Sequence, residues 1–291
     1  MLHIVYNPVS GGGKCAQALR EVESLLRERD TAYMTHPTRN RNDCTSIVRG
    51  ITAEDDPDQK IVVMGGDGTL NEALNGIADP ARVRLGLIPC GSGNDFAAAA
   101  GIPDDPRAAI ELILDGEARY TDYMECSGVR GINAIGTGID VDILRRYSRM
   151  KLLRGSAAYF ASLVLTLFSY KAYRFEETTD GASHPHSAFI ACAGNGSSIG
   201  GGIPICPEAV LDDGLLDVVI VDDIRPIAIP RALITLMRRR ILGYRTTTFK
   251  RQERLRIQSG APMPIQIDGE IYEGLPFDVR LVHGVLRFYR P

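Results

Sequence analysis

Apolar positions follow two rhythms along the first part of the chain. Short, continuous apolar runs alternate with stretches in which apolar side chains recur every three or four residues. The runs occupy residues 3–6, 61–64 and 85–88, and the helical spacing occupies residues 16–29, 70–77 and 108–114. Continuous runs are typical of strands buried on both faces of a parallel sheet. The alternation with helices predicts a doubly wound α/β domain over residues 1–122.

After residue 122 the pattern changes to closely spaced strands. Strand-like runs occupy residues 131–135, 188–193, 216–221, 255–258, 265–267, 277–281 and 285–289, and helical stretches occupy residues 156–169 and 229–242. We therefore predict a mainly β domain with helical insertions over residues 123–291. An alternative arrangement returns the last residues to the N-terminal domain.

One apolar segment, residues 157–170, tests whether the chain crosses a membrane. A spanning helix needs about 20 apolar residues, so this shorter segment is interpreted as a buried core helix. The chain opens directly on a strand-like run without a signal-type leader, which favours a cytoplasmic protein. The six cysteines form no CxxC pair and are expected to be reduced.

Net charge argues against nucleic acid as a partner. The formal charge is -3, the pI is near 6.0, and tryptophan is absent. Nucleic-acid binders usually carry a basic surface and often stacking aromatic side chains. Two local clusters of cations nevertheless stand out, and each is either a solvated face or a site of contact with an anionic membrane. They comprise Arg145, Arg146, Arg149, Lys151 and Arg154, and Arg238, Arg239, Arg240, Arg245, Lys250, Arg251 and Arg254.

A glycine-rich segment follows the first predicted strand and precedes a helix. Glycines allow backbone N–H groups to approach an oxyanion, and the helix N-terminus favours negative charge. The segment is not a Walker A loop, because Pro8 and Cys15 stand where that motif needs glycine and a hydroxyl. On its own it is also compatible with an ordinary strand-to-helix turn. Its candidate phosphate-binding residues are Asn7, Pro8, Ser10, Gly11, Gly12, Gly13 and Lys14.

Two further glycine-rich turns follow the strands at residues 61–64 and 85–88. Each combines glycines with a hydroxyl and a carboxylate, and Asp67 could order a metal-bound water. In a doubly wound sheet, loops at the carboxyl ends of the strands bind ligands. Three such turns predict a nucleotide triphosphate site. The residues concerned are Gly65, Gly66, Asp67, Gly68, Thr69, Leu70, Asn71 and Glu72, and in the third turn Ser92 and Asp95.

The combination of N-P-x-S-G-G-G-K, G-G-D-G-T-L-N-E and G-S-G-N-D-F resembles the bacterial diacylglycerol kinase catalytic family, which includes sphingosine and ceramide kinases. Similar motifs continue to the Asp-Gly-Glu at residues 268–270. The resemblance implies an N-terminal three-layer α/β ATP-binding domain like that of NAD kinase and phosphofructokinase. It also implies a C-terminal β-sandwich and an active site in the cleft between the two.

The resemblance also implies roles for individual residues. ATP would contact Asn7, residues 65–71 and Ser92, together with a threonine after the second strand, either Thr35 or Thr38. Asp67 and Asp95 would hold Mg²⁺. The base would be Asp268 or Glu270, although Asp-Gly alone is also typical of a hairpin turn. A second, structural metal site or an acidic turn would involve Val210, Asp213 and Leu215.

The function expected from this resemblance is an ATP- and Mg²⁺-dependent lipid kinase. It would phosphorylate the hydroxyl of diacylglycerol, giving phosphatidic acid, or of a similar lipid. The alternatives are a small-molecule kinase of the NAD kinase or phosphofructokinase type and a catalytically silent sensor. The protein would be cytoplasmic, peripheral at the inner membrane face, and compatible with a homodimer. One departure is Ala97, near which the family tends to carry an arginine.

Overall fold

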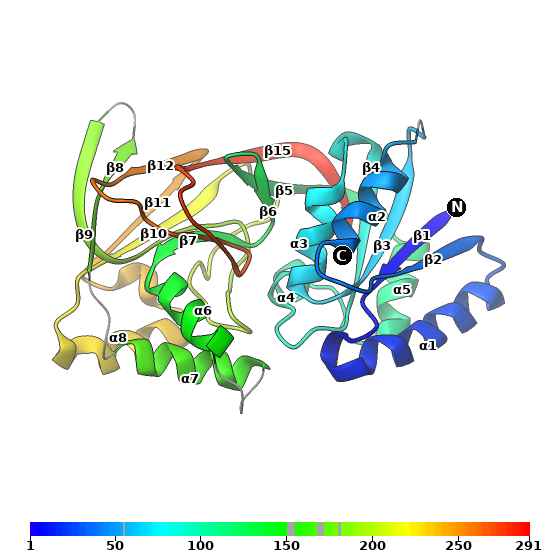
Figure 1. Ribbon diagram of the computed structural model, residues 1–291, viewed down its shortest axis with the longest axis horizontal. Helices are drawn as coiled ribbons and strands as arrows, with labels where there is room; N and C mark the ends of the chain where they lie inside the picture. Colours follow the sequence, from blue (N-terminus) through cyan, green and yellow to red (C-terminus); the bar gives the residue numbers. More distant parts are fainter. Residues whose placement is uncertain (55, 150–154, 168–171, 180–181) are drawn as a thin grey trace. The chain divides into compact units, whose positions relative to one another are not determined.

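The computed structural model describes residues 1–54, 56–149, 155–167, 172–179 and 182–291. The chain divides into two compact units (Figure 1). The first contains residues 1–122 and 283–291, and the second contains residues 123–282. Within the described part of the chain, no helix is both long enough and apolar enough to cross a membrane. All six cysteines are buried free thiols.

The first unit is built on a parallel sheet with the strand order β2-β1-β3-β4-β15. Residues 61–64 of β3 are fully buried, as their uninterrupted apolar run predicts. The last residues of β15 pair with β4, and Phe288 packs against Phe96 with ring centroids 4.9 Å apart. The strands are β1 (Leu2–Tyr6), β2 (Tyr33–Pro37), β3 (Gln59–Gly65), β4 (Val83–Pro89) and β15 (Phe277–Tyr289).

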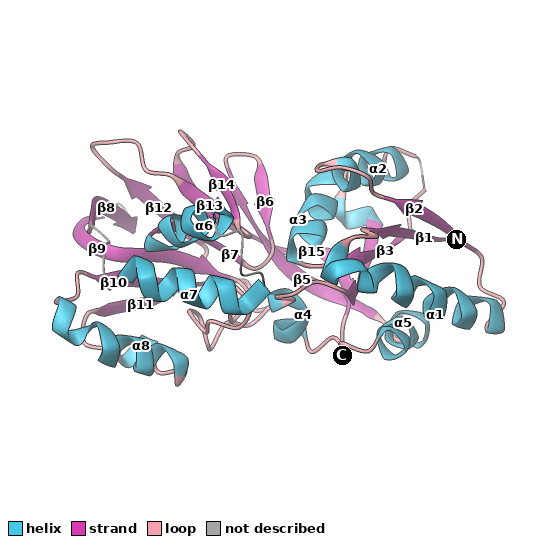
Figure 2. Ribbon diagram, turned by 60° about the horizontal axis from the view of Figure 1, so that its bottom comes forward, coloured by secondary structure: helices cyan, strands magenta, loops and turns pink. Residues whose placement is uncertain are grey.

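Helices cover both faces of this sheet. Helices α1 and α5 lie on one face, and α2 and α3 lie on the other (Figures 1 and 2). The expected three-layer α/β architecture is therefore confirmed. The helical elements are η1 (Ser10–Gly13), α1 (Lys14–Glu28), α2 (Asp43–Thr52), α3 (Asp67–Gly76), η2 (Pro80–Arg82), α4 (Asp95–Ala100) and α5 (Pro106–Asp115).

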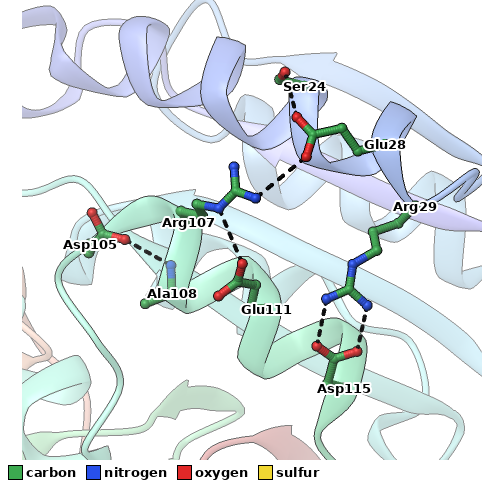
Figure 3. A network of polar contacts seen from close by, with 8 residues as sticks. All are labelled: Ser24, Glu28, Arg29, Asp105, Arg107, Ala108, Glu111 and Asp115. Carbon is green, nitrogen blue, oxygen red and sulfur yellow. Dashed lines mark hydrogen bonds and ion pairs between the residues drawn. The ribbon is translucent and has the colours of Figure 1, made fainter.

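A surface network links α1 to α5 (Figure 3). Arg29 binds both carboxylate oxygens of Asp115 at 3.1 Å. Arg107 bonds to Glu28 at 3.4 Å and to Glu111 at 3.2 Å. These side chains are about half exposed, so each pair stabilises the unit by at most about 1 kcal/mol. Burial of apolar side chains determines how the helices pack, and the network adds a small further stabilisation.

The second unit is a β-sandwich with helices packed on one side. Its strands are β5 (Ala118–Cys126, which enters from the first unit), β6 (Val129–Gly131), β7 (Ala134–Gly138), β8 (Tyr173–Thr179), β9 (Ala182–Gly194), β10 (Leu216–Asp222), β11 (Thr247–Gln252), β12 (Arg254–Gln258), β13 (Ile265–Ile267), β14 (Glu270–Tyr272) and the start of β15. Its helical elements are α6 (Ile139–Arg149), α7 (Gly155–Leu167), η3 (Pro226–Ala228), α8 (Ile229–Met237) and η4 (Ile241–Gly243).

Strand β10 separates the two apolar cores of this unit. Because successive side chains of a strand point to opposite faces, β10 contributes to both cores. Leu216, Val218 and Ile220 pack between strands of the sandwich. Val219 and Val221 pack beneath α6, α7 and α8. This double burial explains why residues 216–221 form a continuous apolar run.

Several predicted boundaries in the second unit are wrong. The strand expected over residues 131–135 is two strands, because the chain breaks at residues 132 and 133 where the backbone binds a carboxylate described below. The strands expected over residues 277–281 and 285–289 are one strand that bends at Gly284, where φ is 69°. The helix expected to reach residue 242 ends at Met237. The end of the helix expected over residues 156–169 lies outside the described residues, beyond Leu167.

Candidate active site

The three glycine-rich turns begin level with one another at one edge of the first unit's sheet. Gly65, at the end of β3, is paired with Pro89, at the end of β4. The backbone N–H of Asn7 donates to the carbonyl of Met64 at 3.0 Å, and the N–H of Cys90 donates to the carbonyl of Gly65 at 2.8 Å. The turns are therefore tied to one another directly, as a shared phosphate site requires.

The first turn packs against the third through Gly11. Gly11 has a φ of 60°, and a Cβ atom at this position would lie 2.3 Å from the carbonyl oxygen of Cys90. The Ser10 hydroxyl donates to the same carbonyl at 3.3 Å. Only glycine satisfies both the backbone conformation and the close approach. Gly12, Gly13 and the exposed Lys14 complete the turn at the start of α1.

The second and third turns meet at a contact between two glycines. A Cβ on Gly91 would lie 2.5 Å from Cα of Gly66, and a Cβ on Gly66 would lie 2.9 Å from Cα of Gly91. The N–H of Gly91 donates to Oδ1 of Asn94 at 2.9 Å, which fixes the third turn from within. Larger side chains at either glycine would separate the two turns.

Asp67 joins the second turn to the start of α4. Its carboxylate accepts the N–H of Asp95 at 3.2 Å and the N–H of Phe96 at 3.1 Å. Negative charge at a helix N-terminus is stabilising, and here it also brings the Asp67 carboxylate beside Asp95, which is buried. Asp67 and Asp95, which were predicted from separate turns, are thus joined through the backbone at the start of α4.

The other predicted nucleotide contacts surround this edge. Asn7 and Pro8 are half-buried, and Ser92 is exposed. Leu70 and Asn71 are buried in α3, and the side chain of Asn75 donates to Asn71 within the same helix. The remaining predicted members, Gly68, Thr69 and Glu72, follow Asp67 along the first two turns of α3.

The two candidate threonines occupy different positions. Thr35 lies inside β2, paired with Ile4, and not in the loop where it was expected. Thr38 is the first residue after β2, and its N–H donates to the carbonyl of Tyr6 at 2.9 Å. Of the two, Thr38 is the one at the edge that carries the glycine-rich turns.

Asp268 and Glu270 lie on the β13–β14 hairpin of the second unit. Ile267 pairs with Glu270, so Asp268 and Gly269 form a two-residue turn in which both residues have positive φ. This is the hairpin that Asp-Gly favours. Turn formation therefore accounts for part of the Asp-Gly-Glu pattern.

The structure distinguishes the two carboxylates. Asp268 accepts the N–H groups of Ile132, Asn133 and Ala134 at 2.7, 2.9 and 2.9 Å. Its side chain therefore holds the segment between β6 and β7 in place. Glu270 is half-buried on β14.

Comparisons with known proteins match both units. Residues 1–126 match the diacylglycerol kinase catalytic domain, and residues 133–290 match the YegS C-terminal NAD kinase beta sandwich-like domain. The diacylglycerol kinase of Bacillus subtilis is 28% identical over 276 residues, covering 94% of this chain and 90% of that protein. "Probable lipid kinase YegS-like" of Cronobacter sakazakii is 33% identical over 211 residues, 70% of each chain. A diacylglycerol kinase crystal structure from Bacillus anthracis has a TM-score of 0.73 at 21% identity, covering 100% of this chain and 96% of that one.

The chain belongs to the diacylglycerol kinase family. The family resemblance found in the motifs is thereby confirmed, and so is the α/β plus β-sandwich fold. Near the departure from the family pattern, Ala97 is fully buried in α4 whereas Ala98 is exposed. An arginine would therefore fit at position 98 but not at position 97.

Asp140 is a buried carboxyl of this diacylglycerol kinase family member that sequence reasoning missed. It stands near the start of α6, beside a narrow apolar cavity beneath α7 and α8, and its Oδ2 lies against Gly136 of β7. Its Oδ1 accepts the N–H of Val141 at 2.8 Å. Burial, and to a lesser degree the charge of Asp142, raises the pKa of Asp140 to about 7. An acidic residue beside a hydrophobic helix pattern is the only sequence signal for this position.

We expect Asp140→Asn to change the pH dependence of stability. The folded-state pKa is near 7 and the ordinary value is 3.8, so between these values the native state retains a proton that the unfolded chain releases. Rising pH should therefore destabilise the native chain by about 1.4 kcal/mol per unit within this window. Urea denaturation measures the free energy of unfolding at each pH. Between pH 5 and pH 7, this free energy should fall by about 2 kcal/mol less in the variant than in the native protein. Parallel pH profiles for the two proteins would contradict this assignment.

The proposed structural metal position lies in the turn before β10. Oδ1 of Asp213 accepts the N–H of Leu215 at 3.0 Å, and Val210 is exposed. Among the described residues, no group of three His, Cys, Asp or Glu side chains is placed to hold a metal ion. The predicted site has one carboxylate and two backbone carbonyls, so it is not a group of three such side chains. The role of Val210, Asp213 and Leu215 therefore stays a prediction.

Proposed function

We propose that this protein is an ATP- and Mg²⁺-dependent lipid kinase that phosphorylates the hydroxyl of diacylglycerol or a similar lipid. With diacylglycerol as acceptor, the product is phosphatidic acid. The observation that carries the proposal is the joining of three glycine-rich turns at one sheet edge, with Asp67 bound to the start of α4. Membership of the diacylglycerol kinase family supports a lipid as the acceptor.

In this mechanism the turns bind the triphosphate. Backbone N–H groups at the start of α1 and in the second turn donate to phosphate oxygens, and Lys14 adds a positive charge. Asp67 and Asp95 suit Mg²⁺, because this ion keeps much of its water and uses one or two carboxylates together with phosphate oxygens. The ion would supply neutralisation of charge on the phosphates. The protein itself provides the positioning on which phosphoryl transfer largely depends.

We assign the base to Glu270. A carboxylate that already accepts three N–H groups, as Asp268 does, would have to lose hydrogen bonds to take a proton. Glu270 follows the Asp268–Gly269 turn of the hairpin and accepts the proton of the lipid hydroxyl. Asp268 is then a positioning residue that holds the hairpin against residues 132–134.

The acyl part of the acceptor fits the apolar cavity of the second unit. Its walls come from α6, α7, α8 and the facing strands. The described lining presents apolar atoms to the cavity, and the carboxylate of Asp140 lies against Gly136 of β7 instead. An acceptor with a long hydrocarbon chain is favoured over a polar metabolite by this lining.

An acceptor assay tests this function. ATP consumption should rise with diacylglycerol in mixed micelles and should not rise with NAD or fructose 6-phosphate. Radiolabel from ATP should appear in an extractable lipid that chromatography resolves. Consumption with NAD alone would instead support the small-molecule kinase, and ATP binding without turnover on any lipid would support a silent sensor.

A further inference from the structure

The α8 surface, defined as residues 225–245, is a basic region of an acidic chain. It contains η3, α8 and η4, and no aspartate or glutamate occurs between residues 224 and 252. Within the described part of the protein, none of its arginines forms an ion pair. All six are exposed: Arg225, Arg231, Arg238, Arg239, Arg240 and Arg245.

Four other described cations of the two sequence clusters form ion pairs, and one of them is Lys250, which pairs with Glu177 at 2.8 Å. Arg251 pairs with Asp217 at 3.0 Å, and Arg254 pairs with Asp278 at 2.6 Å. Arg145 pairs with Glu273. Lys151 and Arg154 lie outside the described residues. These four cations are engaged within the second unit, whereas the six arginines of the α8 surface are available to a partner.

The same surface exposes large apolar side chains. The exposed fraction is 91% for Ile227, 54% for Ile234 and 44% for Met237. Pro230, Ile234 and Met237 follow the spacing of one helix face. An exposed helix face is normally polar, so this stripe is unusual in water.

The opposite face of α8 is already occupied. Ile229 and Ala232 are buried, and both line the apolar cavity with Leu236. The outward stripe is therefore not needed for the core of the unit. Both views show α8 as an outer layer of its unit (Figures 1 and 2).

Arginines also line a groove at the end of α8. Arg231, Arg239, Arg240 and Arg245 surround it together with Tyr244. One acidic residue, Glu208, also lines the groove, and its carboxylate pairs with Arg251 at 3.6 Å. Guanidinium groups bind phosphate oxygens in pairs, and several of them facing one groove suit a phosphate-bearing head group. Charge and shape thus favour the same class of partner.

We propose that the α8 surface docks onto an anionic lipid bilayer. Ile227, Ile234 and Met237 enter the boundary between head groups and acyl chains, while the arginines bind lipid phosphates. An apolar stripe bordered by cations is the pattern of helices that lie in the plane of a membrane surface. The proposal deepens the lipid kinase function, because it places the cavity behind α8 next to the source of its acceptor.

Vesicle binding in the absence of ATP tests the docking. Sucrose-loaded vesicles of phosphatidylcholine with about one quarter phosphatidylglycerol should sediment the protein, and pure phosphatidylcholine should do so at least tenfold less well. Each arginine should contribute roughly fivefold to partitioning. The triple variant Arg231→Gln/Arg238→Gln/Arg240→Gln should therefore lose binding by roughly a hundredfold. Ile227→Ser should bind the vesicles about tenfold less well, because the isoleucine side chain is removed from water only on docking.

A matched triple variant controls for net charge. Arg20, Arg49 and Arg119 are exposed, lie in the first unit and form no ion pair with a described residue. Arg20→Gln/Arg49→Gln/Arg119→Gln should bind vesicles as the native protein does. Unchanged melting temperatures would show that all variants are folded. Equal loss in both triple variants would overturn the proposal and indicate a general charge effect.

Two further experiments distinguish membrane docking from catalysis and from the binding of soluble polyanions. Phosphorylation of a short-chain diacylglycerol dissolved as monomers should be retained in the α8 triple variant, because docking is not needed there. If vesicle binding follows the expected pattern but no lipid is phosphorylated, docking stands and the kinase function fails. If heparin competes fully and Ile227→Ser binds normally, the surface is a site for soluble polyanions and the bilayer proposal is wrong.

Discussion

Replacing Glu270 with glutamine should lower kcat for phosphoryl transfer to diacylglycerol by about a hundredfold to ten-thousandfold, the range typical of a lost general base. Glutamine has nearly the same shape but cannot accept the hydroxyl proton. Glu270 stands on the β14 side of the hairpin, whereas the ATP-binding turns belong to the first unit. ATP affinity should therefore change less than threefold, within about 0.7 kcal/mol. Steady-state kinetics and a fluorescent nucleotide titration measure the two effects.

Asp268→Asn provides the matched comparison. An amide at this position presents an NH₂ group where an oxygen now accepts N–H bonds from residues 132–134. We expect a loss of about 1–3 kcal/mol of unfolding free energy, because hydrogen bonds to a charged group are being broken. Activity should fall together with hairpin stability and be partly recovered on cooling. A variant that is fully stable yet inactive at all temperatures would identify Asp268 as the base.

Replacing Gly91 with alanine should abolish ATP binding at micromolar nucleotide. The added methyl group would lie 2.5 Å from Cα of Gly66 and 2.7 Å from Oδ1 of Asn94, and neither turn can move without losing a tie to the other. Overpacking of this kind costs about 1–3 kcal/mol in stability, and the displaced N–H groups would no longer converge on phosphate. Isothermal titration with ATP measures the affinity.

Gly50→Ala is the control for a glycine substitution in the same unit. Gly50 lies in α2, and a Cβ there meets nothing within 4 Å. Alanine should stabilise this helix by up to about 1 kcal/mol and leave nucleotide binding unchanged. If Gly91→Ala also bound ATP normally, the contact between the second and third turns would have no role in the site.

The nucleotide half could be predicted because its signals are local. Continuous apolar runs predicted the buried strands, and the glycines that follow them predicted the turns. Strand β2 and helix α2 were not predicted. Strand β2 lies at the sheet edge, and its sequence, Tyr-Met-Thr-His-Pro, has no apolar run that would mark it as a buried strand. Thr35 was consequently assigned to a loop, although it lies within that strand.

The second unit could be predicted only in outline. Its decisive contacts join residues far apart in the sequence, as when Asp268 binds the backbone at residues 132–134 and divides a predicted strand in two. That Asp268 accepts three backbone N–H groups could not be known without that contact. Burial of Asp140 likewise involves Gln266 of β13, which lies more than a hundred residues further along the chain. Local patterns carry no information about such partners.

The return of β15 to the first unit has a consequence for biosynthesis. Phe288 must reach Phe96 and β15 must pair with β4 before the N-terminal sheet is complete. At translation rates of about 5–20 residues per second, the roughly 190 intervening residues take about 10–40 s to emerge from the ribosome. Throughout that interval the nascent N-terminal half exposes the unpaired edge of β4 and an uncovered aromatic ring. Chaperones that bind nascent chains should therefore associate with this protein until translation is almost finished.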